Sequence, residues 1–176
     1  MRVLRVSDLA IYPQYPSVLI PTAKPAPSVL QFGLRHYPIF IDLKGRPVLV
    51  VGAGKVALRK TRGLVEAGAQ VTVVAPEWEQ ELESLPVRLV HRRFRASDLA
   101  GVMLVFAATD DRLANHRIAI AAKGRGVLAN IADSPEECDF LVPARVQRDN
   151  LEIAVSTGGA SPRLAADLRR KLEEIL

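Results

Sequence analysis

The sequence predicts a doubly wound parallel α/β sheet followed by a small α+β segment, and three observations lead to this prediction. Short runs such as VLVV, VTVV and MLVFAA are apolar at every position, which is typical of strands that helices cover on both faces. Segments with apolar residues at helical spacing separate these runs. Near the carboxy terminus the alternation ends, and two strands with a polar turn between them are expected instead.

The elements of the sheet are expected in chain order, beginning with the VLVV run. Strands are predicted at about 47–51, 70–75, 87–91, 103–108 and 127–131. Helices are predicted at about 54–67 and 111–123, whereas the segments 77–84 and 96–100 are shorter and less clearly helical. This order places crossover helices between the strands of one parallel sheet.

The segment after Pro135 predicts a hairpin and a final helix. The runs FLVPARV and LEIAVST are the expected strands, and QRDN is the expected turn. In the stretch SPRLAADLRRKLEEIL, Ser161 is expected to cap the helix and Pro162 to occupy its first turn. One face of this helix carries an apolar stripe, formed by Leu164, Leu168, Leu172 and Ile175. Either the stripe packs on its own domain or it contacts a second subunit.

Length and composition bound the class of protein. The 176 residues suffice for one main domain with an appendage, and no apolar run approaches the roughly 20 residues that span a bilayer. We therefore expect no membrane crossing. Much of the net charge of +5 lies in the first 35 residues, and aromatic residues make up only 5% of the chain. A nucleic-acid-binding surface is therefore not expected.

Cysteine and histidine usage narrows the chemistry. Cys138 is the only cysteine, which excludes an internal disulfide and favours a reducing, cytoplasmic location. We interpret it as a small buried residue rather than a nucleophile. His36, His91 and His116 lack the spacing of metal ligands, so no metal cage is expected.

The first 35 residues differ from the rest of the chain. They carry five prolines and no sustained periodicity, and they lack the pattern of a secretory signal or a transit peptide. We expect either a disordered tail or sequence read from a start codon that the cell does not use.

The stretch GAGKVA, residues 52–57, follows a predicted strand and opens a predicted helix, which is the context of a dinucleotide-binding loop. Gly52 permits the sharp turn, Gly54 has no side chain to obstruct a pyrophosphate, and Ala57 lets the helix approach the sheet. The alternative is an unoccupied tight turn. After the second strand, Glu77 lies near the position of a ribose-binding acid, and no arginine or lysine is present to bind a 2′-phosphate. NAD is therefore favoured over NADP.

Two further segments are predicted at the carboxyl ends of strands, where open parallel sheets bind ligands. Asp110 and Asp111, after the fourth strand, are interpreted as carboxylates that begin a helix, where the backbone dipole favours them. Asp133 follows the fifth strand and precedes Ser134 and Pro135. It is either a general base beside a nicotinamide ring or the side chain of an Asx turn before proline.

Five motifs occur together in an order that resembles one known family. They are YPIFIDLKGRPVLVVGAGKVALRK, VMLVFAATDD, NIAD, CDFLVPA and AVSTGGASPRLA. Over about residues 37–176 the sequence resembles the precorrin-2 dehydrogenase family, which includes the amino-terminal part of siroheme synthase. Members of that family have a Rossmann-like domain and oxidise precorrin-2 to sirohydrochlorin with NAD, and some also insert iron.

The resemblance implies a set of site residues, with Asp133 as the general base. The residues implied to bind the cofactor are Gly52, Ala53, Gly54, Lys55, Val56, Pro76, Glu77 and Thr109. The residues implied to bind the tetrapyrrole are Asn130, Ser156, Thr157 and Gly158. These assignments make residues 36–135 the NAD-binding domain and residues 136–176 a segment for dimerisation and substrate binding.

The resemblance also implies partners, above all a homodimer in which the stripe on the last helix would meet the second subunit. The substrate carries several carboxylates, for which Arg145, Arg148 and Arg163 are candidate ligands, the alternative being solvated surface. Family members usually continue into a further helical bundle, so chelation of ferrous or cobaltous ion is the activity that this sequence supports least. A non-catalytic NAD-sensing module is the alternative function.

Overall fold

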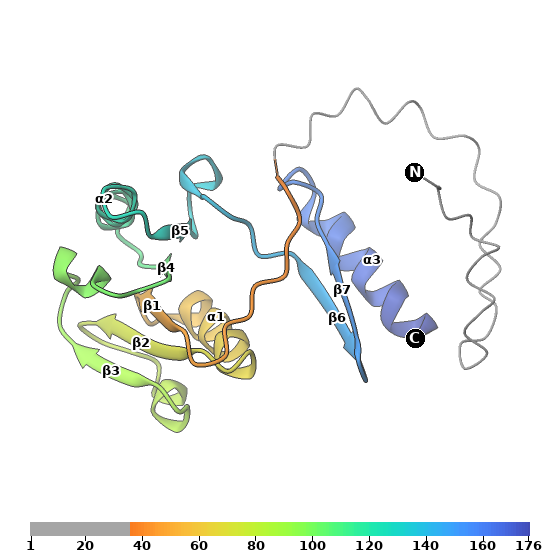
Figure 1. Cartoon of the computed structure of the whole chain (residues 1–176), viewed down its shortest axis with the longest axis horizontal. Coiled ribbons are helices and arrows are strands. Elements are labelled where there is room, and N and C mark those ends of the chain that lie inside the picture. Colours follow the sequence, from red (N-terminus) through yellow and green to blue (C-terminus); the bar gives the residue numbers. More distant parts are fainter. Residues whose placement is uncertain (1–35) are drawn as a thin grey trace. The chain divides into compact units, whose positions relative to one another are not determined.

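A five-stranded parallel sheet organises the chain in the computed structural model, which describes residues 36–176 (Figure 1). The prediction of a tail falls on residues 1–35, which lie outside the described residues. The strands are β1 (Pro47–Val51), β2 (Gln70–Ala75), β3 (Arg88–His91), β4 (Leu104–Ala107) and β5 (Leu128–Ile131). Their spatial order is β3-β2-β1-β4-β5, so the chain reverses its direction of progress beside β1.

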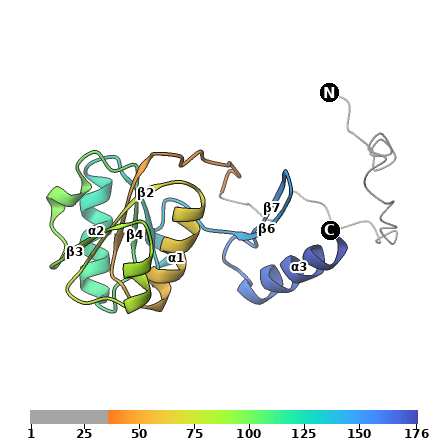
Figure 2. The same ribbon diagram turned by 90° about the horizontal axis from the view of Figure 1, so that it is seen from below.

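Helices cover both faces of this sheet (Figure 2). Helix α1 (Lys55–Glu66) follows β1 and packs on one face, and α2 (Arg112–Lys123) follows β4 and packs on the other. Neighbouring residues of β1 point to opposite faces, and both are buried: Val50 lies in the α1 core and Leu49 in the α2 core. The runs that are apolar at every position are therefore strands covered by helices on both faces, as predicted, and the fold class is confirmed.

The connections between strands and helices are short. Three strand-to-strand connections contain 3₁₀ helices: η3 (Gln80–Ser84), η4 (Ala96–Leu99) and η5 (Pro135–Glu137). The first two occupy the segments whose assignment was unclear. The carboxyl ends of the central strands are tied together by backbone hydrogen bonds, from Gly52 to Val74, from Ala108 to Val51 and from Ala132 to Ala107. The turns at this edge of the sheet are therefore held in register with one another.

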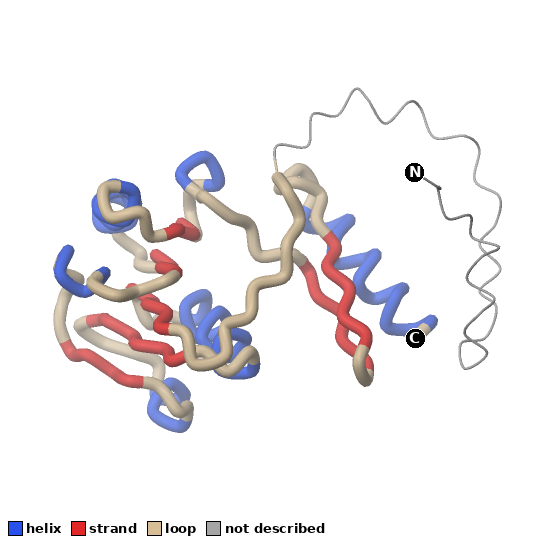
Figure 3. Tube along the Cα trace, in the orientation of Figure 1, coloured by secondary structure: helices blue, strands red, loops and turns tan. Residues whose placement is uncertain are grey.

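The expected hairpin is present, but its turn is shorter than the sequence indicated (Figure 3). Strands β6 (Ala144–Arg148) and β7 (Leu151–Val155) pair antiparallel, with Arg148 opposite Leu151. The turn is therefore Asp149-Asn150 alone rather than QRDN, because Asp149 adopts the left-handed conformation (φ 51°) that a two-residue turn requires. Strand β6 also begins later than predicted, after Pro143, which has no N–H for a ladder.

Helix α3 (Pro162–Ile175) follows the hairpin and begins as predicted, with the Ser161 hydroxyl accepting a hydrogen bond from Leu164 N at 3.3 Å. It contacts β6 and β7, and Ala165 is its only buried residue. Three members of the apolar stripe are exposed: Leu164 by 50%, Leu168 by 39% and Ile175 by 54%. Within the described residues the stripe is thus largely uncovered.

The expected division of the chain near residue 135 stays a prediction. The sheet lies before that point and the hairpin with α3 lies after it. Within residues 36–176, no helix has the length and hydropathy that a membrane span requires.

Candidate active site

The turn between β1 and α1 is closed by Gly52. Its φ is +97°, and its N–H donates to the carbonyl oxygen of Val74 at 3.0 Å. A Cβ built on Gly52 would lie 2.6 Å from the carbonyl carbon of Ala108 and closer still to its oxygen. Only glycine fits here, because the β1–α1 turn and the β4–α2 turn touch at this point.

Helix α1 begins without a side-chain cap. Its N-cap residue is Gly54 (φ −78°), on which a Cβ would meet nothing within 4 Å, and no acidic residue lies in the first turn. Gly54 O accepts the first helical bond, from Leu58 N at 2.9 Å. The amide N–H groups at the start of α1 therefore have no side-chain acceptor and can bind an anion, assisted by the exposed Lys55. These residues fit the diphosphate of a dinucleotide.

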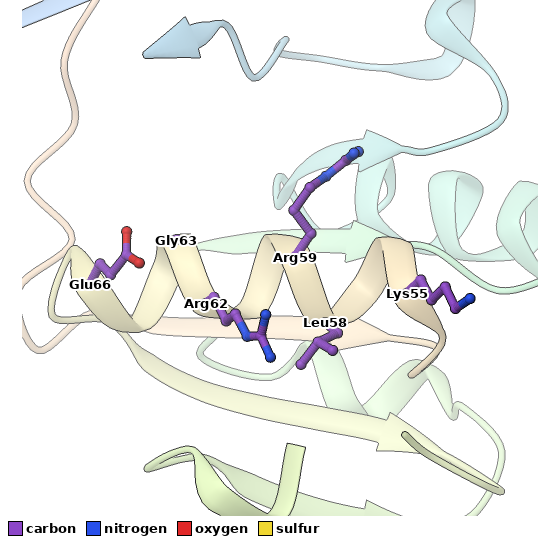
Figure 4. A pocket seen from close by; sticks show the side chains of 6 residues that line it. All are labelled: Lys55, Leu58, Arg59, Arg62, Gly63 and Glu66. Carbon is purple, nitrogen blue, oxygen red and sulfur yellow. The ribbon is translucent and has the colours of Figure 1, made fainter. Parts of the chain in front are cut away.

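A shallow pocket of about 470 Å³ lies along the outer face of α1 (Figure 4). It is lined by Lys55, Leu58, Arg59, Arg62, Gly63 and Glu66. Arg59 and Glu66 extend from one side of the helix, and Leu58 and Arg62 from the other. The pocket shares Lys55 with the expected cofactor site, and its other lining residues lie further along α1. Its three cations against one carboxylate make it attractive to anions.

The turn between β4 and α2 is capped by its own carboxylate. Asp111 is the N-cap of α2, and its Oδ1 accepts hydrogen bonds from Leu113 N (2.9 Å) and Ala114 N (3.1 Å). The interpretation of Asp111 as a carboxylate that begins a helix is confirmed. Thr109, the implied cofactor ligand on this turn, is held by the side chain of Asn115.

Asp133 lies just beyond β5 and is bound to α2. Its Oδ1 accepts a hydrogen bond from Asn115 Nδ2 at 3.0 Å, and its Oδ2 lies 3.9 Å from Arg112 Nε. Its carboxylate does not bond the amides that follow, so the Asx turn is not formed. The side chain keeps 37% of its surface exposed and is open to a substrate. Its role as general base stays a prediction.

A charged cluster beside Asp133 joins α2 to η5. Glu137 forms an ion pair with Arg112 at 2.6 Å and a hydrogen bond with His116, and Arg112 also donates to the Ser134 hydroxyl at 3.2 Å. The hydrogen bond from His116, assisted by Ser134 and Arg112, lowers the pKa of Glu137. No partner for His116 was predicted from the sequence. The spacing of Arg112 and His116, one helical turn apart, was the signal for a shared acidic partner.

Asn130, an implied substrate ligand, is only 6% exposed and bridges α1 to the chain after η5. Lys60 Nζ donates to its Oδ1 at 2.7 Å, and its Nδ2 donates to Phe140 O at 3.0 Å. The Lys60 ammonium also lies 5.2 Å from the centre of the Phe106 ring. Burial, together with the nearby Arg59, lowers the pKa of Lys60. Contact of Asn130 with the substrate stays a prediction.

Cys138 fills a structural position. Its sulfur accepts a hydrogen bond from Ile131 N at 3.1 Å and donates to Ile131 O at 3.3 Å. Burial raises the pKa of this thiol, so it stays protonated and weakly nucleophilic. These contacts agree with the interpretation of Cys138 as a packed residue.

The remaining expected site residues lie in three places. Ala53 is buried in the glycine turn, where its carbonyl accepts from Glu79 N at 3.1 Å, and Val56 is exposed on the first turn of α1. Pro76 and Glu77 are exposed directly after β2.

The implied tetrapyrrole ligands Ser156, Thr157 and Gly158 form the turn between β7 and α3. Ser156 Oγ accepts from Gly158 N at 3.1 Å, and Thr157 Oγ1 accepts from Ser161 N at 3.1 Å. Within residues 36–176, no hydrogen bond joins this turn to the carboxyl edge of the sheet. The structure brings Gly52, Thr109 and Asp133 together through Ala108 and Asn115.

Of the candidate arginines, Arg145 is already engaged. It forms ion pairs with Glu66 at 3.0 Å and Glu152 at 3.8 Å. Arg148 and Arg163 are exposed.

Comparisons with known proteins bear on the same segments. Residues 39–144 match a family model described as NAD(P)-binding, and residues 148–175 match one described as the central part of sirohaem biosynthesis proteins. The siroheme synthase of Ectopseudomonas mendocina (strain ymp) is 47% identical over 142 residues, covering 80% of this chain and 31% of that protein. That of Methylococcus capsulatus is 45% identical over 142 residues, covering 78% and 30%. The chain thus spans less than a third of the length of these curated relatives.

A solved structure extends the comparison to the fold. SirC, a precorrin-2 dehydrogenase, is similar with a TM-score of 0.71 at 33% sequence identity. The match covers 80% of this chain and 71% of that one.

Proposed function

Because the chain belongs to the precorrin-2 dehydrogenase family of NAD(P)-binding proteins, we propose that it oxidises precorrin-2 to sirohydrochlorin in siroheme biosynthesis. The observation that carries this proposal is the contact between Gly52 and Ala108. It sets an uncapped helix start beside the strand ends that bear Thr109 and Asp133. This adjacency supports a diphosphate site next to a proton acceptor.

Different residues of the chain would bind the cofactor and accept the proton. The amides at the start of α1, with Lys55, would hold the diphosphate. Bound NAD would supply the hydride acceptor. As hydride leaves the macrocycle, Asp133 accepts the proton that the substrate loses in the same two-electron oxidation. The exposed side chain of Asp133 can then release this proton to solvent.

The cofactor is proposed to be NAD rather than NADP. Glu77 and Glu79 follow β2, and no arginine or lysine lies among them, so a 2′-phosphate would be repelled. Purified protein should therefore reduce NAD with a kcat/KM at least tenfold above that for NADP. Equal values for the two cofactors would contradict this assignment.

The exposed stripe on α3 supports a homodimer, because Leu164, Leu168 and Ile175 would be covered by a second copy.

Ferrous or cobaltous ion, if inserted, enters as a substrate bound by the macrocycle nitrogens. Residues 36–176 hold no group of three or more His, Cys, Asp or Glu side chains that could bind a metal ion.

The test follows sirohydrochlorin by its absorbance after purified protein is mixed with NAD and precorrin-2. Asp133→Ala should lower kcat by about a hundredfold or more, the range of a lost general base, with NAD affinity within twofold of wild type. Asp167→Ala, on the surface of α3, is the matched control and should be unchanged. NAD binding without turnover by the wild-type protein would favour the sensing module, and undiminished turnover by D133A would remove Asp133 from the mechanism.

A further inference from the structure

Asn115 is a fully buried polar residue in the first turn of α2. It lies on α2, is 0% exposed, and follows the N-cap Asp111 by four residues. A buried side-chain amide is costly unless its polar atoms are bonded. All of the polar groups of Asn115 are bonded, and their partners come from two different strand ends.

The oxygen of Asn115 faces the β4–α2 turn. Its Oδ1 accepts hydrogen bonds from Thr109 N at 3.2 Å and from Thr109 Oγ1 at 2.7 Å. Because a backbone N–H is always a donor, the atom that faces it must be the amide oxygen. This contact fixes the orientation of the whole amide group.

The nitrogen of Asn115 consequently faces two acceptors. Its Nδ2 donates to Thr109 O at 3.1 Å and to Asp133 Oδ1 at 3.0 Å. The second of these hydrogen bonds links α2, which follows β4, to the loop that follows β5. The other contact of the Asp133 carboxylate is the long one to Arg112, at 3.9 Å.

We propose that Asn115 is a positioning residue, which sets the carboxylate of Asp133 relative to the cofactor-side turn at Thr109. This inference rests on the proposed function. One rigid amide joins the implied cofactor ligand to the implied general base, so the two keep a constant separation. Proton and hydride leave the same substrate, and a displacement of about 1 Å between their acceptors can cost on the order of a hundredfold in rate.

The charged groups around Asp133 define what a substitution would do. On α2 these groups are Arg112 and His116, and on η5 they are Glu136 and Glu137. Glu137 is already paired with Arg112 and His116, and Glu136 accepts a hydrogen bond from Ser134. A new carboxylate at position 115 would therefore face Asp133, whose carboxylate has only the long contact with Arg112, at 3.9 Å, to offset the added charge.

The main test is Asn115→Asp, which keeps the size of the side chain and the acceptor for Thr109. It replaces the donor toward Asp133 by a second negative charge. We expect kcat to fall by about tenfold to a hundredfold, with NAD affinity within twofold of wild type. The acid limb of the pH–kcat profile should move up by about one pH unit, because a neighbouring carboxylate disfavours ionisation. A merely structural role would lower activity at every pH and leave this limb in place.

Controls separate the possible failures. Asn150→Asp makes the same chemical change in the exposed hairpin turn and should leave kcat and the profile unchanged. Asn115→Ala removes the donor without adding charge, and should also lower kcat and move the acid limb upward, by less. Thermal unfolding reports whether each variant is folded.

The outcomes are distinct. A folded N115D with wild-type kcat and profile overturns the positioning role. If N115D does not fold, N115A decides by the same two readouts, and failure of both to fold assigns Asn115 to the fold alone. A wild-type protein without turnover refutes the proposed function instead.

Discussion

The two strand-to-helix turns that meet at Gly52 are built in opposite ways. At the start of α2, the Asp111 carboxylate accepts hydrogen bonds from two otherwise free amides, those of Leu113 and Ala114. At the start of α1, the N-cap is Gly54, and no side chain accepts from the first amides. One turn satisfies its donors internally, whereas the other leaves them for a ligand. In a fold of this kind, a missing cap at one helix beside a complete cap at the next indicates which turn binds an anion.

The two glycines of the first turn differ in the same way. Gly52 is required by the protein, because it has positive φ and is in contact with Ala108. Gly54 has ordinary φ and open space around it, so its protein contacts do not explain why a side chain is absent. The open space at Gly54 is what the proposed diphosphate site requires.

The largest expected effect is on stability, from Gly52→Ala. Positive φ costs about 1–2 kcal/mol for a residue with a Cβ, and overpacking against Ala108 adds about 1–3 kcal/mol. The free energy of unfolding, measured by chemical denaturation, should fall by the sum of the two. Gly101→Ala is the matched control, since Gly101 has φ +71° but an open Cβ position. Equal losses in the two variants would show that the clash is relieved at no cost.

Gly54→Ala should separate binding from stability. The free energy of unfolding should change by less than about 0.5 kcal/mol, because the weaker N-cap is offset by the reduced entropy of the unfolded chain. NAD affinity, measured by titration calorimetry, should fall by about tenfold, equivalent to about 1.4 kcal/mol. Unchanged affinity would mean that the diphosphate does not approach this residue.

Asp111→Ala should do the reverse at the second turn. Loss of the cap should lower the free energy of unfolding by about 1 kcal/mol, while NAD affinity stays within twofold of wild type. Asp111→Asn keeps a capping oxygen and should recover most of the stability. A loss of NAD affinity in D111A would show that the two turns do not divide their tasks in this way.

Lys55→Glu should change the stability only slightly. A carboxylate in the first turn of α1 favours the helix by about 0.3–1 kcal/mol, so the unfolding temperature should rise slightly. NAD affinity should fall, because the same carboxylate repels the diphosphate. Lys55→Gln, without the new charge, should lie between wild type and K55E in both measurements. A rise in NAD affinity in K55E would contradict an anion site at this helix start.

The sequence predicted the sheet closely because its strands are apolar on both faces, a pattern that identifies β1 and β2 as buried strands of a parallel sheet. The sequence also placed the glycine turn directly after β1 and Asp133 directly after β5, where the structure has them. It did not predict Asn115 or the Lys60–Asn130 hydrogen bond, since apolar periodicity reports which face is buried and not which polar groups meet there. The partners Lys60 and Asn130 are 70 positions apart. The hairpin turn was predicted two residues too long because QRDN is polar throughout, whereas Gln147 and Arg148 pair within β6 and only Asp149-Asn150 form the turn.

The steric fit of Gly52 bears on attempts to change the cofactor preference of this protein. The β1–α1 turn is packed against Ala108 at this point, so substitutions at position 52 would lower stability without creating a new cofactor specificity. Pro76 and Glu77, by contrast, are exposed beyond β2 and can be exchanged without disturbing that junction. A library aimed at accepting a phosphorylated ribose should therefore be built there.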